Sequence, residues 1–388
     1  MSEQIRAGDM LMTLFTGAGY TAIEPPVLQP AELFLDLSGE EMRRRMFVTL
    51  DANGTELCLR PEYTIPVCRA HLAASRTDAA PAQYCYRGPV FRLRAGETGE
   101  FQQAGVESIG RRDIAATDAE MLGLATEALA HLGIVPQRIA LGDVGLLEAL
   151  LTALDIPAAA RARLMRAIVA GNGLAALAEP AETEEAESGT IRHAGLLAAL
   201  EGQDPKAARA FVEDVLSIAG ISSVGGRSAG DIARRFLDRA GRNGGDVAPE
   251  ARAVLRRYLA IAGDPDTAAS AIRALAADAG LAMEAALDLF EERNGFLAAR
   301  GIDPAQLAFR ADFARNLDYY TGFIFDIAAD PDPAARPLVG GGRYDRLARH
   351  LDADRPLPAI GCAFWLDRIA ACRAGTASAG ESVQGESA

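Results

Sequence analysis

Hydrophobic and polar positions follow different periods along the chain, and the changes of period mark its organisation. Residues 1–18 predict a helix that ends at a glycine, and short strand-like runs follow it. The run 46–62 holds two apolar stretches joined by Asp-Ala-Asn-Gly, which is typical of a β-hairpin. Strand-like runs return after residue 300, in AFRADFA, GFIFDIAA and AIGCAFWLD. The pattern therefore predicts an α+β fold whose sheet-forming segments are separated in the sequence.

The middle of the chain differs from both ends in its amino-acid composition and spacing. Alanine, leucine and arginine dominate there with helical spacing and Gly, Pro or Asp breaks, which predicts an all-helical insertion. The last residues are small and polar, a composition typical of disorder. The predicted division is 1–146 for the first part of the core, 147–300 for the helical insertion, 301–372 for the second part of the core and 373–388 for a disordered tail.

Two further runs combine structural and chemical signals. Residues 117–133, TDAEMLGLATEALAHLG, predict an amphipathic helix with its N-cap at Thr117 or Asp118. Residues 360–369, IGCAFWLDRI, contain the single tryptophan, Trp365, close to several small residues. This second run is apolar at most positions and reads either as a strand or as the buried start of a helix.

Composition and charge exclude several functional classes. The chain has 388 residues, of which 49% are hydrophobic and 24% charged, as in an ordinary soluble protein. Its net charge of −14 argues against nucleic acid as a partner, although Arg87, Arg92 and Arg94 form a local basic run. The chain shows no signal-peptide pattern and no run long enough to span a bilayer, so we expect no membrane partner.

The five cysteines lack CxxC spacing and the four histidines are widely spread, so no zinc site and no cofactor are expected. Free cysteines fit a cytoplasmic location, because that compartment is reducing. We expect thiols that only pack in the interior. The cysteines are Cys58, Cys68, Cys85, Cys362 and Cys372.

Two C-terminal motifs carry candidate chemistry, and each also has a structural interpretation. The glycine triplet of residues 340–345, GGGRYD, permits close approach of the backbone to a ligand, or it forms a tight strand-to-helix turn. Residues 315–322, RNLDYYTG, gather a cation, an acid, two phenols and a hydroxyl. Such a cluster can hold a zwitterion, or it forms a polar loop held by its own hydrogen bonds.

Two earlier segments, LRPEYT at 59–64 and EFQQAGVE at 100–107, add acids and amides. If the second segment is a strand, Gln103 and Glu107 share a face because they are four residues apart. On a buried face they need polar partners, which an ammonium or imidazole group would provide. An exposed strand face without a ligand is the alternative.

The order of these motifs resembles the catalytic core of histidyl-tRNA synthetase, a class II synthetase, over about residues 5–370. The resemblance implies a mostly antiparallel sheet flanked by helices, and a dimer formed through the first motif around Pro26. The segments that carry it are GYTAIEPPVL, LRPEYT, YRGPVFRLR, EFQQAGVESIG, ARNLDYYTGFIFDI, GGGRYDRL and AIGCAFWLDR.

The resemblance also implies a pocket for histidine, because every side-chain type that holds this ligand in the family is present. The residues are Glu62 and Thr64 at the amino group with Gln103 beside them, Glu107 and Tyr320 at the imidazole, Arg315 at the carboxylate, and Tyr319 in the same Tyr-Tyr block.

The implied nucleotide site departs from the family in three places. Arg92 matches the arginine that binds the α-phosphate, but Arg94 stands where a glutamate contacts adenine, and a guanidinium cannot accept that hydrogen bond. The following loop, AGETGE, is short and acidic, which repels a triphosphate. In the third motif Trp365 takes the place of a glycine, while Arg368 is kept. We therefore expect a degenerate nucleotide site and no catalytic residues.

This combination is similar to the family of ATP phosphoribosyltransferase regulatory subunits, which resemble the synthetase without its activity. The chain ends soon after Arg368, so no anticodon-binding domain and no tRNA partner are expected. The resemblance implies a hetero-oligomer with the short-form catalytic subunit, which needs this chain for activity and is inhibited by histidine through it. The inhibitory histidine would bind either in the retained pocket or where the two chains meet. The alternatives are a synthetase paralogue that still forms an adenylate, and a histidine-binding protein with another partner.

Overall fold

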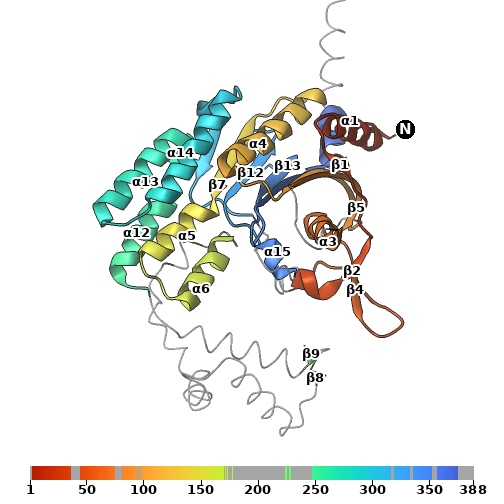
Figure 1. Cartoon of the computed structure of the whole chain (residues 1–388), viewed down its shortest axis with the longest axis horizontal. Helices are drawn as coiled ribbons and strands as arrows, with labels where there is room; N and C mark the ends of the chain where they lie inside the picture. The colour runs from red at the N-terminus through yellow and green to blue at the C-terminus, as the bar shows by residue number, and fades with distance from the viewer. Residues whose placement is uncertain are drawn as a thin grey trace, which may run out of the picture.

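The computed structural model contains a nine-stranded sheet, a separate three-stranded sheet and surrounding helices (Figure 1). The residues that it describes are 2–35, 44–74, 81–93, 96, 98–169, 171, 173, 177, 223–224, 227–228, 247–315, 319–332, 335–351 and 356–374.

The helices and strands follow one another along the whole described chain. The helices are α1 (Glu3–Gly17), α3 (Thr64–Ala74), α4 (Ile114–His131), α5 (Val144–Ala153), α6 (Ala158–Val169), α12 (Pro249–Leu259), α13 (Pro265–Ala279), α14 (Glu284–Ala299), α15 (Leu347–His350) and the 3-10 helix η3 (Pro304–Gln306). Residues 31–35 and 366–374 are also helical. The strands are β1 (Thr21–Ala22), β2 (Leu28–Pro30), β3 (Val48–Leu50), β4 (Glu56–Leu59), β5 (Ala82–Phe91), β6 (Glu100–Ile109), β7 (Arg138–Asp143), β8 (Ser223–Val224), β9 (Arg227–Ser228), β10 (Ala262–Gly263), β11 (Leu307–Arg310), β12 (Phe323–Ala328), β13 (Val339–Arg343) and β14 (Ala359–Trp365).

The large sheet has the predicted antiparallel character. Its order is β1-β5-β6-β14-β13-β12-β7-β11-β10, and only the β1–β5 and β7–β11 pairs are parallel. The predicted hairpin at 46–62 forms from β3 and β4 of the small sheet. Its turn is held by the Asp51 carboxylate, which accepts hydrogen bonds from the amides of Asn53 and Thr55, and Gly54 supplies the positive φ of 84°.

The two faces of the large sheet differ in chemistry because side chains alternate along each strand. On β6, Ala104 and Val106 join the main hydrophobic core, which includes residues of α1 and α4. Gln103 and Glu107 lie on the opposite face, the side of α3, and each is only 1% exposed. The prediction that they share a face is confirmed, and the alternative of an exposed strand face is wrong. In Figure 1, α1 and α4 lie on one side of the curved sheet and α3 on the other.

The described residues of the predicted insertion are mainly helical, and its last helices pack on the core. Figure 1 shows α12, α13 and α14 side by side, with α14 next to α4. The pattern did not predict β8, β9 and β10, because a two-residue strand has no period; β10 pairs with β11 at the edge of the large sheet. One hydrophobic core joins residues from all three predicted segments. The domain boundaries at 146 and 300 therefore remain predictions.

The predicted N-cap of α4 is wrong. The helix begins at Ile114 and its N-cap is Asp113, so that Thr117 and Asp118 lie inside the helix and are buried. The Thr117 hydroxyl donates to the carbonyl oxygen of Asp113 at 2.7 Å. Asp118 has long-range partners that no local pattern reveals.

Asp118 belongs to a buried ionic cluster that joins α4 to α14 and to β13. Its carboxylate lies 3.3 Å from Nη1 of Arg293 and 2.6 Å from Nη2 of Arg343, and Arg293 also donates to Asp143 at 2.6 Å. Asp118, Arg293 and Arg343 are each at most 3% exposed. Because buried charges are costly unless they are paired, this cluster fixes how the helical layer meets the sheet.

The C-terminal run 360–369 is a strand for its first six residues and a helix from residue 366. Its interpretation as the start of a helix is therefore wrong up to Trp365. The helix continues to residue 374, and Arg373 forms an ion pair of 2.7 Å with Glu3 of α1. Of the predicted disordered tail, residues 375–388 lie outside the described residues.

Candidate ligand-binding site

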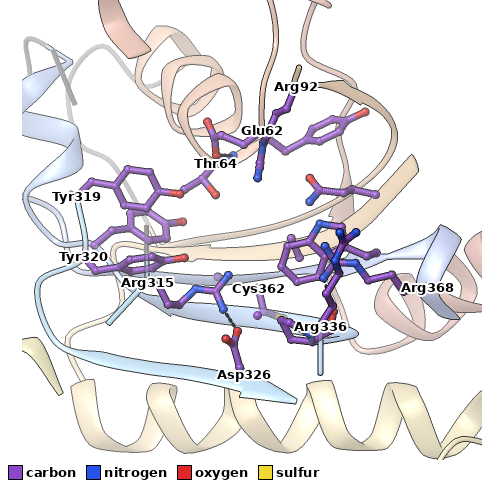
Figure 2. A pocket seen from close by; sticks show the side chains of 18 of the residues that line it. Glu62, Thr64, Arg92, Arg315, Tyr319, Tyr320, Asp326, Arg336, Cys362 and Arg368 are labelled. Carbon is purple, nitrogen blue, oxygen red and sulfur yellow. Dashed lines mark hydrogen bonds and ion pairs between the residues drawn. The ribbon is translucent and has the colours of Figure 1, made fainter. Parts of the chain in front are cut away.

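A cavity of about 600 Å³ opens on the α3 side of the large sheet (Figure 2). Its walls come from β5, β6, β13 and β14, from the start of α3 and from the segments before β12 and β13. The structure brings together nine residues predicted from sequence. They are Glu62, Thr64, Gln103, Arg315, Tyr319 and Tyr320 of the histidine set, and Arg92, Trp365 and Arg368 of the nucleotide set.

Glu107 lies beneath the cavity wall and not in it. Oε1 of its carboxyl group accepts a hydrogen bond of 2.8 Å from the Thr64 hydroxyl, and Oε2 accepts one from the Tyr344 hydroxyl. Gly361 makes room for this group, since a Cβ at that position would overlap Oε2 of Glu107. Burial raises the pKa of Glu107 from 4.5 to about 8, and the nearby charge of Glu62 adds to the increase. The carboxyl group is therefore mostly protonated near neutral pH.

Glu62 has already used part of its hydrogen-bonding capacity at the start of α3. Its carboxylate accepts hydrogen bonds from the amides of Thr64 and Ile65, at 2.6 and 2.9 Å. Amides in the first turn of a helix have no partner within the helix, and a carboxylate at this end is favoured. Burial nevertheless raises the pKa of Glu62, because it outweighs these hydrogen bonds and the charge of Arg92. Glu62 and Glu107 are thus connected through hydrogen bonds to Thr64, at the part of the cavity wall where α3 begins.

Arg315 reaches the cavity with an anionic partner already in place. Its guanidinium forms an ion pair with Asp326 of β12 and donates to the carbonyl oxygen of Phe325 at 3.2 Å (Figure 2). Gly340 permits this arrangement, because a Cβ there would overlap the guanidinium. The glycine triplet therefore lies inside strand β13 and serves close approach, and its interpretation as a tight turn is wrong.

Three phenols of neighbouring tyrosines line the cavity. The Tyr319 ring lies 5.0 Å from the Tyr320 ring and 5.8 Å from the Tyr344 ring, measured between centroids. Burial raises the pKa of all three hydroxyl groups, so they stay protonated and can donate hydrogen bonds. Residues 316–318 of the RNLDYYTG motif lie outside the described residues.

The part of the cavity where the resemblance implies a nucleotide site is lined by arginine and tryptophan side chains. The Arg368 guanidinium lies 4.5 Å from the centroid of the Trp365 ring and donates to the carbonyl oxygen of Pro337 at 2.6 Å. Arg92 donates to the carbonyl oxygen of Pro61 at 2.6 Å. Trp365 packs with Tyr63 and other aromatic residues and is 6% exposed. Arg94 lies outside the described residues, and so do Ala95 and Glu97 of the AGETGE loop.

Sequence reasoning missed several residues that line the cavity. Tyr344 and Gly361 lie inside motifs that had been recognised, so their positions could have been inferred from them. Asp326 lies in strand β12, and nothing in its local sequence indicated that it lines a cavity. Arg45 and Arg336 lie outside every motif and reach the cavity only through the fold.

The described residues contain no group of three or more His, Cys, Asp or Glu side chains that could hold a metal ion. No helix in the described part of the chain is long and apolar enough to cross a membrane. Burial raises the pKa of the thiols, to about 12 for Cys58 and Cys68 and to about 11 for Cys85. Such thiols are poor nucleophiles, and they fit the prediction that the cysteines only pack.

The raised pKa of Glu107 predicts a stability that falls with pH. Between about pH 4.5 and 8 the folded protein keeps a proton that the unfolded chain has lost, so the free energy of unfolding decreases as the pH rises, by up to about 1.4 kcal/mol for each pH unit. Glu107→Gln cannot lose this proton, so its stability relative to the wild type should increase from pH 5 to pH 9. Urea denaturation across this range measures the effect, and parallel curves would contradict it.

Comparison with known proteins finds a matching family model and curated relatives. A family model described as histidyl-tRNA synthetase matches residues 2–219 and 234–369. The ATP phosphoribosyltransferase regulatory subunit of Mesorhizobium japonicum is 42% identical over 93% of this chain and 95% of its own length. That of Brucella canis is 40% identical over 90% of this chain and 92% of its own length.

Solved structures confirm the predicted fold class. A structure described as an ATP phosphoribosyltransferase regulatory subunit/histidyl-tRNA synthetase from Bacillus halodurans matches with a TM-score of 0.65 and 23% identity, over 95% of this chain and 78% of that chain. Histidyl-tRNA synthetase from Nostoc matches with a TM-score of 0.63 and 18% identity, over 96% of this chain and 72% of that chain. Together with the curated relatives, these matches establish that the chain has a class II synthetase-like fold and belongs to the family of ATP phosphoribosyltransferase regulatory subunits.

Proposed function

We propose that this chain binds the short-form catalytic subunit of ATP phosphoribosyltransferase in the cytoplasm, is required for its activity, and transmits inhibition by histidine at the first step of histidine biosynthesis. The observation that carries the proposal is the close similarity to proteins named as regulatory subunits of this enzyme, over nine-tenths of the chain. A regulatory chain acts through the difference between its ligand affinities in two assembly states.

The chemistry of the cavity supports histidine as the ligand. Glu62 and Gln103 offer acceptors for an ammonium group, and the phenols of Tyr319 and Tyr320 can donate to an imidazole nitrogen. Glu107 would then act through Thr64, since the Thr64 hydroxyl lies between its carboxyl group and the cavity. A cavity of about 600 Å³ accommodates an amino acid, as small-ligand pockets commonly do.

The segment around Pro26 supports self-association as a dimer. Val27 and Leu28 follow this proline and are 36% and 50% exposed. Arg60 ties the same segment to the cavity wall: it donates to the carbonyl oxygen of Pro25 at 2.6 Å and lies 4.1 Å from the centroid of the Tyr63 ring. Exposed apolar residues on a segment this firmly held fit an interface between two copies.

Mixing the chain with a purified short-form catalytic subunit is expected to raise phosphoribosyl-ATP formation by roughly tenfold or more, and histidine should reverse the increase. Sedimentation of the same mixtures measures dimer and complex formation. Absence of activation would contradict the proposal. Histidine-dependent exchange of pyrophosphate into ATP would instead indicate an adenylate-forming paralogue.

A further inference from the structure

The two residues that follow the Tyr-Tyr block of the cavity are held from both sides by the core. Thr321 and Gly322 come directly after Tyr320 and do not line the cavity themselves. The amide of Thr321 donates to the carbonyl oxygen of Arg343 at 2.8 Å, and the carbonyl oxygen of Gly322 accepts from the amide of Val144 at 3.0 Å. The position of Tyr320 is therefore tied to strand β13 and to the start of α5.

The side chain of Thr321 adds a second connection at the end of β13. Its hydroxyl accepts a hydrogen bond of 3.0 Å from the amide of Asp345 and donates one of 3.4 Å to the carbonyl oxygen of Arg343. The carboxylate of Asp345 in turn accepts hydrogen bonds from Nη1 of Arg343 at 2.9 Å and from the amide of Ala359 at 2.8 Å. Tyr344, which lies between Arg343 and Asp345 in the sequence, lines the cavity. The Thr321 hydroxyl thus joins the two segments that carry the cavity tyrosines.

These hydrogen bonds form a closed ring with the buried ionic cluster. Nε of Arg343 donates to Asp118 at 2.8 Å, and Asp118 lies 3.3 Å from Nη1 of Arg293. Arg293 donates to Asp143 at 2.6 Å, and Asp143 directly precedes Val144, where the ring closes. The ring therefore connects the cavity tyrosines to α14, although no residue of this helix lines the cavity.

Burial makes the ring a stiff connection. Asp118, Arg293 and Arg343 are each at most 3% exposed. Gly322 lies directly against Arg343, since a Cβ on this glycine would be 3.3 Å from Cδ of the arginine. Water cannot replace a broken contact in such a network, so each lost contact is costly. A displacement of one member is therefore expected to move its neighbours.

We propose that Thr321 is a positioning residue through which this ring transmits ligand binding at the cavity tyrosines to α14. The inference rests on the proposed histidine pocket and adds the route by which the helical layer responds to its ligand. Coupling between two sites is reciprocal. A partner that fixes α14 would therefore change the affinity for the ligand by the same factor.

Hydrogen exchange of the full chain, with and without histidine, tests the proposal. Each protein receives histidine at the same multiple of its own dissociation constant, measured by calorimetry, so that the general stabilisation by binding is equal. In the wild type, the amides of α14 should slow roughly tenfold more than those of α1. Helix α1 is the internal reference, because it packs on β5 and β6 outside the ring.

Two substitutions of Thr321 form a matched pair. Thr321→Val keeps the shape of the side chain and removes the hydroxyl, so the extra slowing of α14 should fall below about threefold. Thr321→Ser keeps the hydroxyl and should retain the full effect. Neither substitution removes a group from the cavity wall.

The wild-type chain alone can overturn the relay, even if Thr321→Val does not fold. That result would be an α14 that slows no more than α1 at saturating histidine. Equal extra slowing of α14 in the wild type and in Thr321→Val would overturn the role of Thr321. Absence of histidine binding by the wild-type chain would overturn the histidine pocket itself, and this inference with it.

Discussion

Asp118→Asn is expected to lower the free energy of unfolding by about 3–5 kcal/mol, the typical cost of breaking a buried ion pair. The substitution keeps the volume of the side chain and removes the negative charge between Arg293 and Arg343, which are 1% and 3% exposed. Asp143 remains paired with Arg293 at 2.6 Å, and this second ion pair limits the loss of stability. Urea denaturation followed by circular dichroism measures the change.

A surface ion pair provides the matched control. Asp288 pairs with Arg273 at 3.3 Å, but its side chain is 69% exposed, and exposed pairs contribute little to stability. Asp288→Asn should therefore unfold at nearly the same urea concentration as the wild type. If the two variants behaved alike, the ionic cluster of α4, α14 and β13 would not be important for stability.

The second large effect is expected for Gly361→Ala, which should abolish measurable binding of histidine. A Cβ at this position would overlap Oε2 of Glu107 and lie 2.7 Å from the carbonyl oxygen of Val106. The carboxyl group of Glu107 would have to leave the Thr64 and Tyr344 hydroxyls, which disorders the cavity wall around these two residues. Calorimetric titration with histidine and thermal denaturation measure the two consequences.

A rescue variant separates this clash from a general loss of folding. Removing the carboxyl group in Gly361→Ala/Glu107→Ala should recover part of the lost thermal stability, because contacting residues are not additive. Gly295→Ala is the control, since it lies in α14 with nothing within 4 Å of the added methyl group and should be slightly stabilising. A double variant no more stable than Gly361→Ala would show that the clash with Glu107 is not the cause.

Local periodicity predicted one important strand of the cavity. The alternation along residues 100–107 predicted that Gln103 and Glu107 share a face, and β6 confirms it. It could not predict that Glu107 lies beneath the cavity wall, because that depends on the glycine opposite it in β14. The motif order predicted the fold, which the comparisons confirm.

The errors arose where a residue serves a distant partner. Asp118 has the residue type of a helix cap, yet its partners Arg293 and Arg343 follow it by 175 and 225 positions in the chain. The glycine triplet is compatible with a turn, but it lies in a strand where a Cβ at each position would overlap a neighbour, which at Gly340 is the Arg315 guanidinium. Arg45 and Arg336 reach the cavity from segments with no pattern at all. Such contacts are properties of the tertiary fold.

The position of the single tryptophan has a practical consequence for spectroscopy. Trp365 lines the cavity, and the chain has no other indole, so tryptophan emission comes from this one site. The guanidinium of Arg368 lies against the ring, which makes the emission sensitive to any movement of that cation. The unlabelled protein therefore carries its own optical reporter of cavity occupancy, in free form and within an assembly.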